Sequence, residues 1–177
     1  KPNDICQTAR GDIYFTDPDF AKPGPEGRSA VYRVSPSGEL KKVIDNMALP
    51  NGIIASHDGR TIYVADSHEK LWRSYNLQRD GSLDEGRVFF NPEVEDRSSP
   101  DGMTIDERGN LYFTGRGGLW VVSPQGKSLG FVPCPVFVSN VAFGGVDGKL
   151  LFITGSKKVF SLKGKISGRG LERTGIE

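Results

Sequence analysis

A polar-to-aromatic pattern that occurs four times is the feature that most limits the folds open to this sequence. In each copy, an Asn or Asp stands 11 or 12 residues before an aromatic residue. The polar positions are Asn3, Asn51, Asp101 and Asn140, and the aromatic positions are Tyr14, Tyr63, Tyr112 and Phe152. The polar residues are separated by 48, 50 and 39 residues, and the copies begin near residues 1, 49, 99 and 138. A repeat of this length predicts neighbouring copies of one supersecondary unit.

The local sequence inside each copy is typical of short β-strands. The segment TIYVADS, residues 61–67, alternates apolar and polar side chains, and no segment has a sustained 3.6-residue apolar period. We therefore expect an all-β chain in which residues 1–177 form a partial β-propeller domain of about four blades. NGIIAS and DGMTID should be inner strands, and GRVFF should be an outer strand. A β-sandwich is the alternative, but it does not predict one polar residue at the same point of four units.

Composition and charge argue against several classes of partner. The 23 basic and 22 acidic residues leave a formal net charge of +1. With no basic run, the sequence predicts neither nucleic-acid nor membrane-surface binding. No apolar stretch approaches the roughly 18 to 20 residues of a membrane span. Because the sequence begins with Lys1 rather than Met, it leaves open an upstream segment and the compartment, cytoplasm or periplasm, with the cytoplasm preferred.

Cysteine and histidine chemistry has little support in the sequence. Cys6 and Cys134 do not make a disulfide framework, and we expect each to be a buried, inert thiol. His57 lies in a turn and His68 just past a strand end, with no serine elbow motif nearby. The sequence therefore favours neither a Ser-His-Asp triad nor metal binding by histidine.

The repeated Asn and Asp residues are the candidates for a metal site. In a propeller, the first strand of each blade runs along the central channel, so side chains at its start converge at one rim. Asn3, Asn51 and Asp101, with Asn140 as a fourth candidate, would supply oxygen ligands of the kind that calcium and magnesium prefer. Each residue could instead merely cap the turn into its strand. The fourfold coincidence favours the metal site.

Several segments resemble a known family, among them KPND…GDIYFTDP, LPNGIIASHDGRTIYVADS and PDGMTIDERGNLYFTGRGGLWVVSPQGKSLG. From Lys1 to about Lys165, they are similar to the six-bladed propellers of the senescence marker protein, gluconolactonase and luciferin-regenerating enzyme-like family. The resemblance implies a divalent metal at the channel mouth, with calcium favoured and zinc possible. The implied ligands in this chain are Asn3, Asn51 and Asp101. A glutamate ligand would come from an upstream blade, so we expect the C-terminal two-thirds of a propeller.

The resemblance also implies a reaction, the hydrolysis of sugar-acid lactones. A cation can polarise the lactone carbonyl while a neighbouring carboxylate accepts a proton from water. Asp101 would be both ligand and base, and Asn3 and Asn51 would be ligands that also orient the substrate. Lys1 stands where relatives often carry a substrate-contacting arginine, so it keeps the charge but loses the bidentate fork.

Acidic residues in the loop TDPDFAKPGPEGRSA are further candidates for a substrate contact. Asp17, Asp19 and Glu26 all lie there, and none falls cleanly in the family register. Asp17 is the best candidate because it closes the strand IYFTD on the same rim. These acids could instead simply solvate a loop that contains three prolines.

Two functional classes remain open from the sequence. The first is a metal-dependent lactonase or related ester hydrolase whose partner is a small-molecule lactone or sugar acid. The second is a non-catalytic or truncated propeller that acts as a binding or scaffold module. An incomplete ring would leave open blade faces, which should pair with the missing propeller segment or with another copy. A closed four-bladed ring is the alternative architecture.

Overall fold

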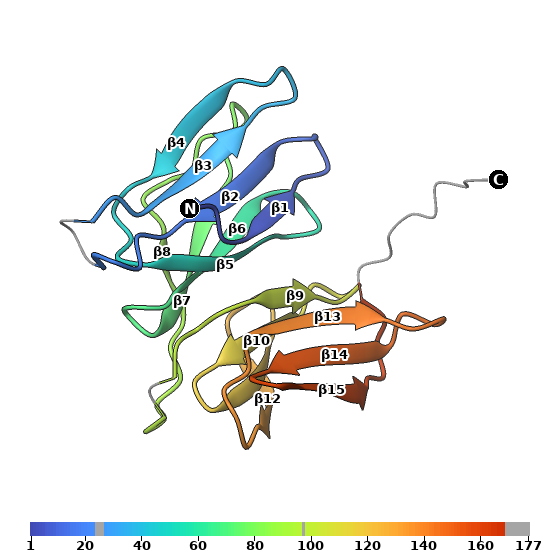
Figure 1. The fold of residues 1–177 in the computed structure, drawn as a ribbon. Helices are drawn as coiled ribbons and strands as arrows, with labels where there is room; N and C mark the ends of the chain where they lie inside the picture. Colours follow the sequence, from blue (N-terminus) through green and yellow to red (C-terminus); the bar gives the residue numbers. More distant parts are fainter. Residues whose placement is uncertain (24–26, 97, 169–177) are drawn as a thin grey trace.

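The computed structural model describes residues 1–23, 27–96 and 98–168, and in this part of the chain it contains strands but no helix (Figure 1). Blade 1 consists of β1 (Ile5–Gln7), β2 (Ile13–Asp17), β3 (Ala30–Val34) and β4 (Leu40–Ile44). Blade 2 consists of β5 (Pro50–Ala55), β6 (Thr61–Asp66), β7 (Leu71–Asn76) and β8 (Arg87–Phe90). Blade 3 consists of β9 (Met103–Ile105), β10 (Leu111–Gly115), β11 (Gly118–Val122) and β12 (Ser128–Pro133). Blade 4 consists of β13 (Asn140–Gly144), β14 (Leu150–Gly155) and β15 (Lys158–Lys163).

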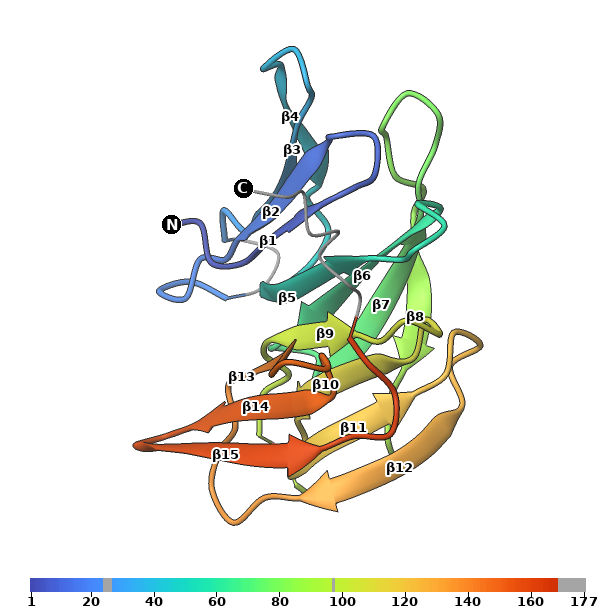
Figure 2. The same cartoon turned by 90° about the vertical axis from the view of Figure 1, so that its right-hand side faces the viewer.

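Each blade is an antiparallel meander whose strands follow one another in sequence order. The first strands lie next to one another, with β5 beside β1 and β9, and β9 beside β13. Figures 1 and 2 show the four blades following one another around an arc. The prediction of an all-β propeller arrangement is confirmed, with NGIIAS and DGMTID contributing to inner strands and GRVFF to an outer strand. No helix in the described ranges has the length and apolar character needed to span a membrane.

The hydrophobic core is divided into layers between successive blades. The layer between blades 2 and 3 is the most aromatic, and in it the rings of Trp72 and Phe113 stack with centroids 4.9 Å apart. Separate clusters fill the spaces between blades 1 and 2 and between blades 3 and 4. Each inner strand is therefore held in position by apolar side chains packed between neighbouring blades, rather than by packing within its own sheet.

The four repeated aromatic residues occupy equivalent places on the second strands. Tyr14, Tyr63, Tyr112 and Phe152 pair across the inner hairpins with Cys6, Ile54, Thr104 and Ala142, respectively. The three tyrosines are buried, whereas Phe152 is 40% exposed. The difference arises because each tyrosine faces the blade that follows it, and within the described residues no blade follows β13–β15.

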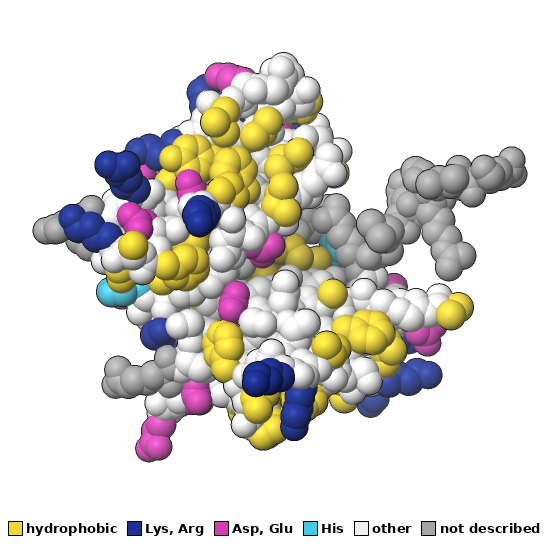
Figure 3. Space-filling view, viewed as in Figure 1, with side chains coloured by type: hydrophobic (Ala, Val, Ile, Leu, Met, Phe, Trp, Pro, Cys, Tyr) yellow, Lys and Arg dark blue, Asp and Glu magenta, His cyan; other side chains and the backbone are white. Residues whose placement is uncertain are grey.

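The outward faces of blades 1 and 4 carry exposed apolar side chains. On blade 1, Ile5 is 63% exposed, and on blade 4, Phe152 and Val159 are exposed. Figure 3 shows apolar patches over both blades on one side of the molecule. We call these surfaces the open faces. Apolar sheet surfaces of this kind are normally covered in folded proteins.

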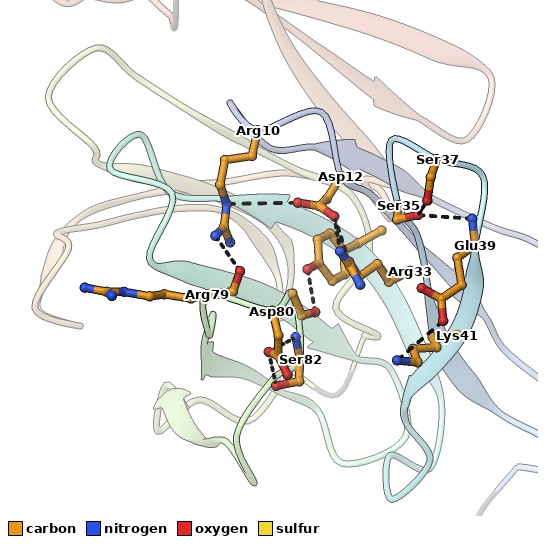
Figure 4. Close-up of polar contacts among 12 residues, drawn as sticks. Arg10, Asp12, Arg33, Ser35, Ser37, Glu39, Lys41, Arg79, Asp80 and Ser82 are labelled. Carbon is orange, nitrogen blue, oxygen red and sulfur yellow. Dashed lines mark hydrogen bonds and ion pairs between the residues drawn. The ribbon is translucent and has the colours of Figure 1, made fainter.

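A buried ion pair joins elements at the rim opposite the starts of the inner strands (Figure 4). The Asp12 side chain is almost fully buried, and its carboxylate accepts a hydrogen bond from Nε of Arg33 at 2.7 Å. Nη2 of Arg33 forms an ion pair with the same carboxylate oxygen at 2.6 Å. Arg10 lies 4.0 Å from the same carboxylate and donates from Nη1 to the Arg79 carbonyl of blade 2 at 3.0 Å. These contacts lock the β1–β2 turn to the β7–β8 connection, so this rim has a structural role.

Candidate functional site

Two of the repeated polar residues occupy equivalent positions in their blades, just before the inner strand begins. The amide of Asn3 donates to Thr16 O at 2.8 Å, and the amide of Asp101 donates to Thr114 O at 3.1 Å. Asn51 lies at the corresponding point of β5, where the register shifts between Pro50 and Ile53. We call the rim where the four inner strands start the channel mouth.

The prediction that Asn140 is the fourth copy is wrong by one residue. Ser139, rather than Asn140, donates its amide to the second strand in the equivalent way, to Thr154 O at 2.9 Å. The cause is the length of the inner hairpin. Ala142 pairs with Phe152 ten residues later, whereas the equivalent partners in blades 1 and 3 are eight residues apart. Counting back 12 residues from Phe152 therefore reaches Asn140 instead of Ser139.

Two glycines allow the inner strands to approach closely at the channel mouth. A Cβ atom on Gly52 would lie 2.2 Å from the backbone oxygen of Asp101, and one on Gly102 would lie 2.2 Å from Oδ1 of Asn140. Neither glycine has a positive φ. The glycines after Asn51 and Asp101 thus serve close backbone approach rather than a tight turn.

The Asn51 amide is buried, with a donor end that is satisfied and an acceptor end that is not. Asn51 is 6% exposed, and its Nδ2 donates to Ser67 Oγ at 3.0 Å. The side chain also lies close enough to the Asp101 carboxylate to lower the pKa of that acid, against the larger effect of burial. Its Oδ1 has no hydrogen-bond partner among the described residues. A buried acceptor without a partner is costly, so this oxygen is available to a ligand that the amide can coordinate.

Two carboxylates meet at the same place. Burial and the nearby charge of Asp4 raise the pKa of Asp101 to about 6. Burial also raises the pKa of Asp4, although its oxygens accept hydrogen bonds from the amides of Ile53 at 3.0 Å and Ile5 at 2.8 Å. Raised pKa values on neighbouring acids mean that negative charge here is poorly compensated by the protein.

Asp4 is the mouth residue that the sequence reasoning missed. It directly follows Asn3 and takes the place that Gly102 occupies in blade 3, because Thr16 N donates to Asp4 O as Thr114 N donates to Gly102 O. The signal was present in the sequence, since an acid in the copy at Pro2 replaces the glycine of two other copies.

The donor set suits a hard divalent cation. Such ions bind carboxylate and amide oxygens, and they would offset the charge of Asp4 and Asp101 while using Oδ1 of Asn51. Among the described residues, no three His, Cys, Asp or Glu side chains form a metal cluster. A cation held here would therefore depend on amide and carboxylate oxygens together.

The predicted substrate-contacting residues lie at the edge of the mouth. Asn3 is exposed, and the Lys1 side chain is fully exposed. The α-amino group of Lys1 contacts the carboxylate of Asp17, the last residue of β2. Asp19 instead organises its own loop by accepting hydrogen bonds from the amides of Lys22 and Arg28, and Glu26 lies outside the described residues.

The cysteines and histidines do not join this site. Cys6 and Cys134 are half-buried, so the expectation that both thiols are buried is wrong. Each packs against the rim of a core cluster, Cys6 between blades 1 and 2 and Cys134 between blades 3 and 4. His57 lies at the opposite rim, with Nε2 2.5 Å from Asp106 O, and His68 Nδ1 is 3.2 Å from the Glu69 carboxylate.

Comparison with known proteins gives consistent matches. The family described as SMP-30/gluconolactonase/LRE-like region matches residues 1–157. A gluconolactonase of Zymomonas mobilis subsp. mobilis is 32% identical over 185 residues, which cover 94% of this chain and 51% of that protein. Regucalcin of Danio rerio is 33% identical over 132 residues, which cover 71% of this chain and 44% of that protein. The chain thus spans about half the length of these relatives.

Solved structures give the same result for the fold. A gluconolactonase from Xanthomonas campestris has a TM-score of 0.78 and 31% identity, covering 92% of this chain and 56% of that one. A calcium-binding protein from Agrobacterium tumefaciens, also named regucalcin, has a TM-score of 0.80, covering 95% of this chain and 62% of that one. Its identity is 21%, so this second likeness concerns the fold alone.

Proposed function

This chain belongs to the SMP-30/gluconolactonase/LRE-like family, and on that basis we propose that it carries most of the active site of a metal-dependent sugar-lactone hydrolase. Relatives named gluconolactonase, lactonohydrolase and pentonolactonase support hydrolysis of this class of ester. Because the chain spans only part of those relatives, the activity is proposed for the propeller that its blades help to build.

The observation that carries the proposal is the unpartnered Oδ1 of Asn51 beside two half-buried carboxylates, those of Asp4 and Asp101. The Asn51 side chain and the charge of Asp4 both act on the pKa of the Asp101 carboxyl, and Oδ1 of Asn51 has no hydrogen-bond partner among the described residues. A scaffold or binding module has no need for uncompensated acids and an unsatisfied amide at one point, because both lower stability. A bound cation would offset the charge of the acids and would be coordinated by the amide oxygen.

We propose that Asp101, Asn51 and Asn3 hold a divalent cation, with calcium favoured over zinc because all the donors are oxygens. Asp4 adds a second carboxylate close to this set. When bound, such a cation polarises the lactone carbonyl and stabilises the oxyanion formed as water attacks. Regucalcin-like relatives agree with a cation-binding family, and the one from Agrobacterium tumefaciens is described as calcium-binding.

The chain's own residues would handle the proton and the substrate. With its pKa raised to about 6, the Asp101 carboxylate is ionised at neutral pH and still basic enough to accept a proton from the attacking water. Exposed donors at the rim, Lys1 and Asn3, would contact the hydroxyl groups of a sugar acid. Asp17 would accept hydrogen bonds from the same hydroxyls.

The test is calorimetric titration with calcium and with zinc, run beside a pH-indicator assay on gluconolactone, on a propeller in which the upstream segment has been joined to this chain. We expect Asp101→Ala to abolish metal-dependent hydrolysis and Asn51→Ala mainly to weaken cation binding. Glu39→Ala, which changes an exposed acid at the opposite rim, is the control. Unchanged turnover and affinity in Asp101→Ala would refute the proposal and favour a non-catalytic binding or scaffold propeller.

We further propose that the two open faces pack against additional propeller blades. Ile5, Phe152 and Val159 have exposed side chains, whereas residues at the equivalent positions of other blades are buried between blades. The known relatives are about twice as long as the matched region, which supports a further segment of chain as the partner. A second copy of this chain is the other outcome, and sedimentation analysis distinguishes the two.

A further inference from the structure

We infer that Ser67 is a positioning residue that sets the orientation of the Asn51 amide and holds the segment leading into Asp101. This inference rests on the proposed cation site, because its functional consequence is the direction in which Oδ1 of Asn51 is presented. Ser67 directly follows β6, and no metal ligand or substrate contact is assigned to it. Its hydroxyl lies between blades 2 and 3.

The argument begins with the single proton of the Ser67 hydroxyl. Ser67 Oγ lies 2.5 Å from the carbonyl oxygen of Pro100, which can only accept a hydrogen bond. The hydroxyl must therefore donate to Pro100 and can only accept from its other neighbour. That neighbour is Asn51, with its side-chain nitrogen 3.0 Å away.

Because Ser67 donates its only hydroxyl proton to Pro100, the orientation of the Asn51 amide is determined. An amide flipped by 180° would place its oxygen against Ser67 Oγ, where no proton is left to share. Nδ2 therefore faces Ser67, and Oδ1 faces the position where it has no partner among the described residues. A single hydroxyl thus keeps the acceptor end of Asn51 free for a cation.

The same hydroxyl also links two blades at the mouth. Asn51 belongs to blade 2, whereas Pro100 directly precedes Asp101 in blade 3. Ser67 is 3% exposed, so water cannot readily replace its hydrogen bonds. Its own backbone is held by donation from Ser67 N to Leu49 O at 3.0 Å.

Neighbouring contacts hold the Ser67 turn in place. Oδ1 of Asp66 accepts hydrogen bonds from the amides of His68 and Glu69, each at 3.0 Å. Nζ of Lys70 donates to Oγ of Ser99 at 2.7 Å, which ties this turn to the segment before Asp101. The Ser67 hydroxyl is therefore carried by a rigid turn, as a group that orients another side chain needs to be.

The test compares three variants of the 177-residue chain. Ser67→Ala removes the hydroxyl, and Ser67→Thr keeps it. Ser74→Ala is the matched control, because Ser74 is an equally buried serine of blade 2 whose hydroxyl has no hydrogen-bond partner among the described residues. The two measurements are the NMR signals of the Asn51 side-chain amide and the calcium affinity by titration.

We expect Ser67→Ala to shift the Asn51 amide protons and speed their exchange with water. It should also weaken calcium binding about tenfold or more, as loss of an orienting hydrogen bond to a ligand typically does. Ser67→Thr should restore the amide signals and most of the affinity. Ser74→Ala should leave both unchanged.

Two results would overturn the inference. One is a Ser67→Ala variant whose Asn51 amide signals and exchange match the wild type. The other is a Ser74→Ala variant with the same losses, because the effect would then come from general loosening of blade 2. If the wild-type chain binds neither calcium nor zinc, the proposed cation site does not form in these blades alone, and the amide signals still decide the role of Ser67.

Discussion

Substituting Gly52 by Ala tests how the channel mouth is built. A Cβ atom at this position would lie 2.2 Å from Asp101 O and 3.1 Å from Cα of Gly102. Ordinary van der Waals contact of a Cβ begins at 3.4 Å. The starts of β5 and β9 would therefore have to separate by roughly 1 Å in a close-packed region. Because the clashing atoms belong to the backbone, no side-chain rotation can relieve the contact.

The magnitude follows from overpacking and from misplacement. Forcing an extra methyl group into a packed site costs about 1–3 kcal/mol of the free energy of unfolding. In a domain of this size that lowers Tm by roughly 3–10 °C. A displacement of about 1 Å between Asn51 and Asp101 should also reduce lactone turnover on the order of 100-fold.

Thermal unfolding and calcium titration of Gly52→Ala would check this expectation. Gly130→Ala is the control, because a Cβ on this glycine of β12 meets nothing within 4 Å. Its Tm should equal or slightly exceed that of the wild type. The reasoning fails if Gly52→Ala melts and binds calcium as Gly130→Ala does, since close backbone contact would then not set the spacing of the mouth.

Three further predictions concern the ion pair, the acids and the open faces. Asp12→Ala should lower the free energy of unfolding in urea by about 2–3 kcal/mol, because it leaves the half-buried Arg33 guanidinium unpaired. Glu39→Ala, which removes an exposed pair with Lys41, should have almost no effect. The pKa of Asp101, raised to about 6 from 3.8, means that this carboxyl stabilises the fold below pH 3.8 and loses that contribution as the pH rises through about 6. Without cations, Tm should therefore fall between about pH 4 and pH 7, and less so in Asp101→Asn; equal slopes would contradict the assignment. In sedimentation velocity, a double Phe152→Ser, Val159→Ser variant should self-associate less than the wild type, and unchanged association would exclude the blade 4 open face.

The fold could be predicted from the sequence because its signals are local and repeated. Alternating strands and one aromatic residue per unit fixed the inner and outer strands of blades 2 and 3. The start of β9 could not be predicted. The segment DGMTID places it at Asp101, whereas the strand begins at Met103. The amide of Gly102 donates to Ser139 O of the next blade, and such a contact between blades leaves no local trace in the sequence.

The site was only partly predictable. Repetition identified Asn51 and Asp101, which lie side by side, while their metal-binding role stays a prediction. Asp4 was missed because spacing alone does not tell which of two adjacent polar side chains meets a distant carboxylate. Ser67 was missed because it acts from a turn 16 residues after Asn51, and a hydrogen bond across that separation follows only from the hairpin geometry.

The repeated aromatic positions also bear on how such chains diversify after duplication. Tyr14 donates its hydroxyl to Gly81 O at 2.8 Å, Tyr112 donates to Asp106 at 3.2 Å, and Phe152 has no hydroxyl. The Tyr14 contact crosses from blade 1 to the β7–β8 connection of blade 2, whereas Tyr112 and Asp106 belong to the same blade. Replacing blade 2 with a copy of another blade would therefore leave the buried Tyr14 hydroxyl without its acceptor. Positions of similar shape thus make different polar contacts, so the blades of this chain are not interchangeable.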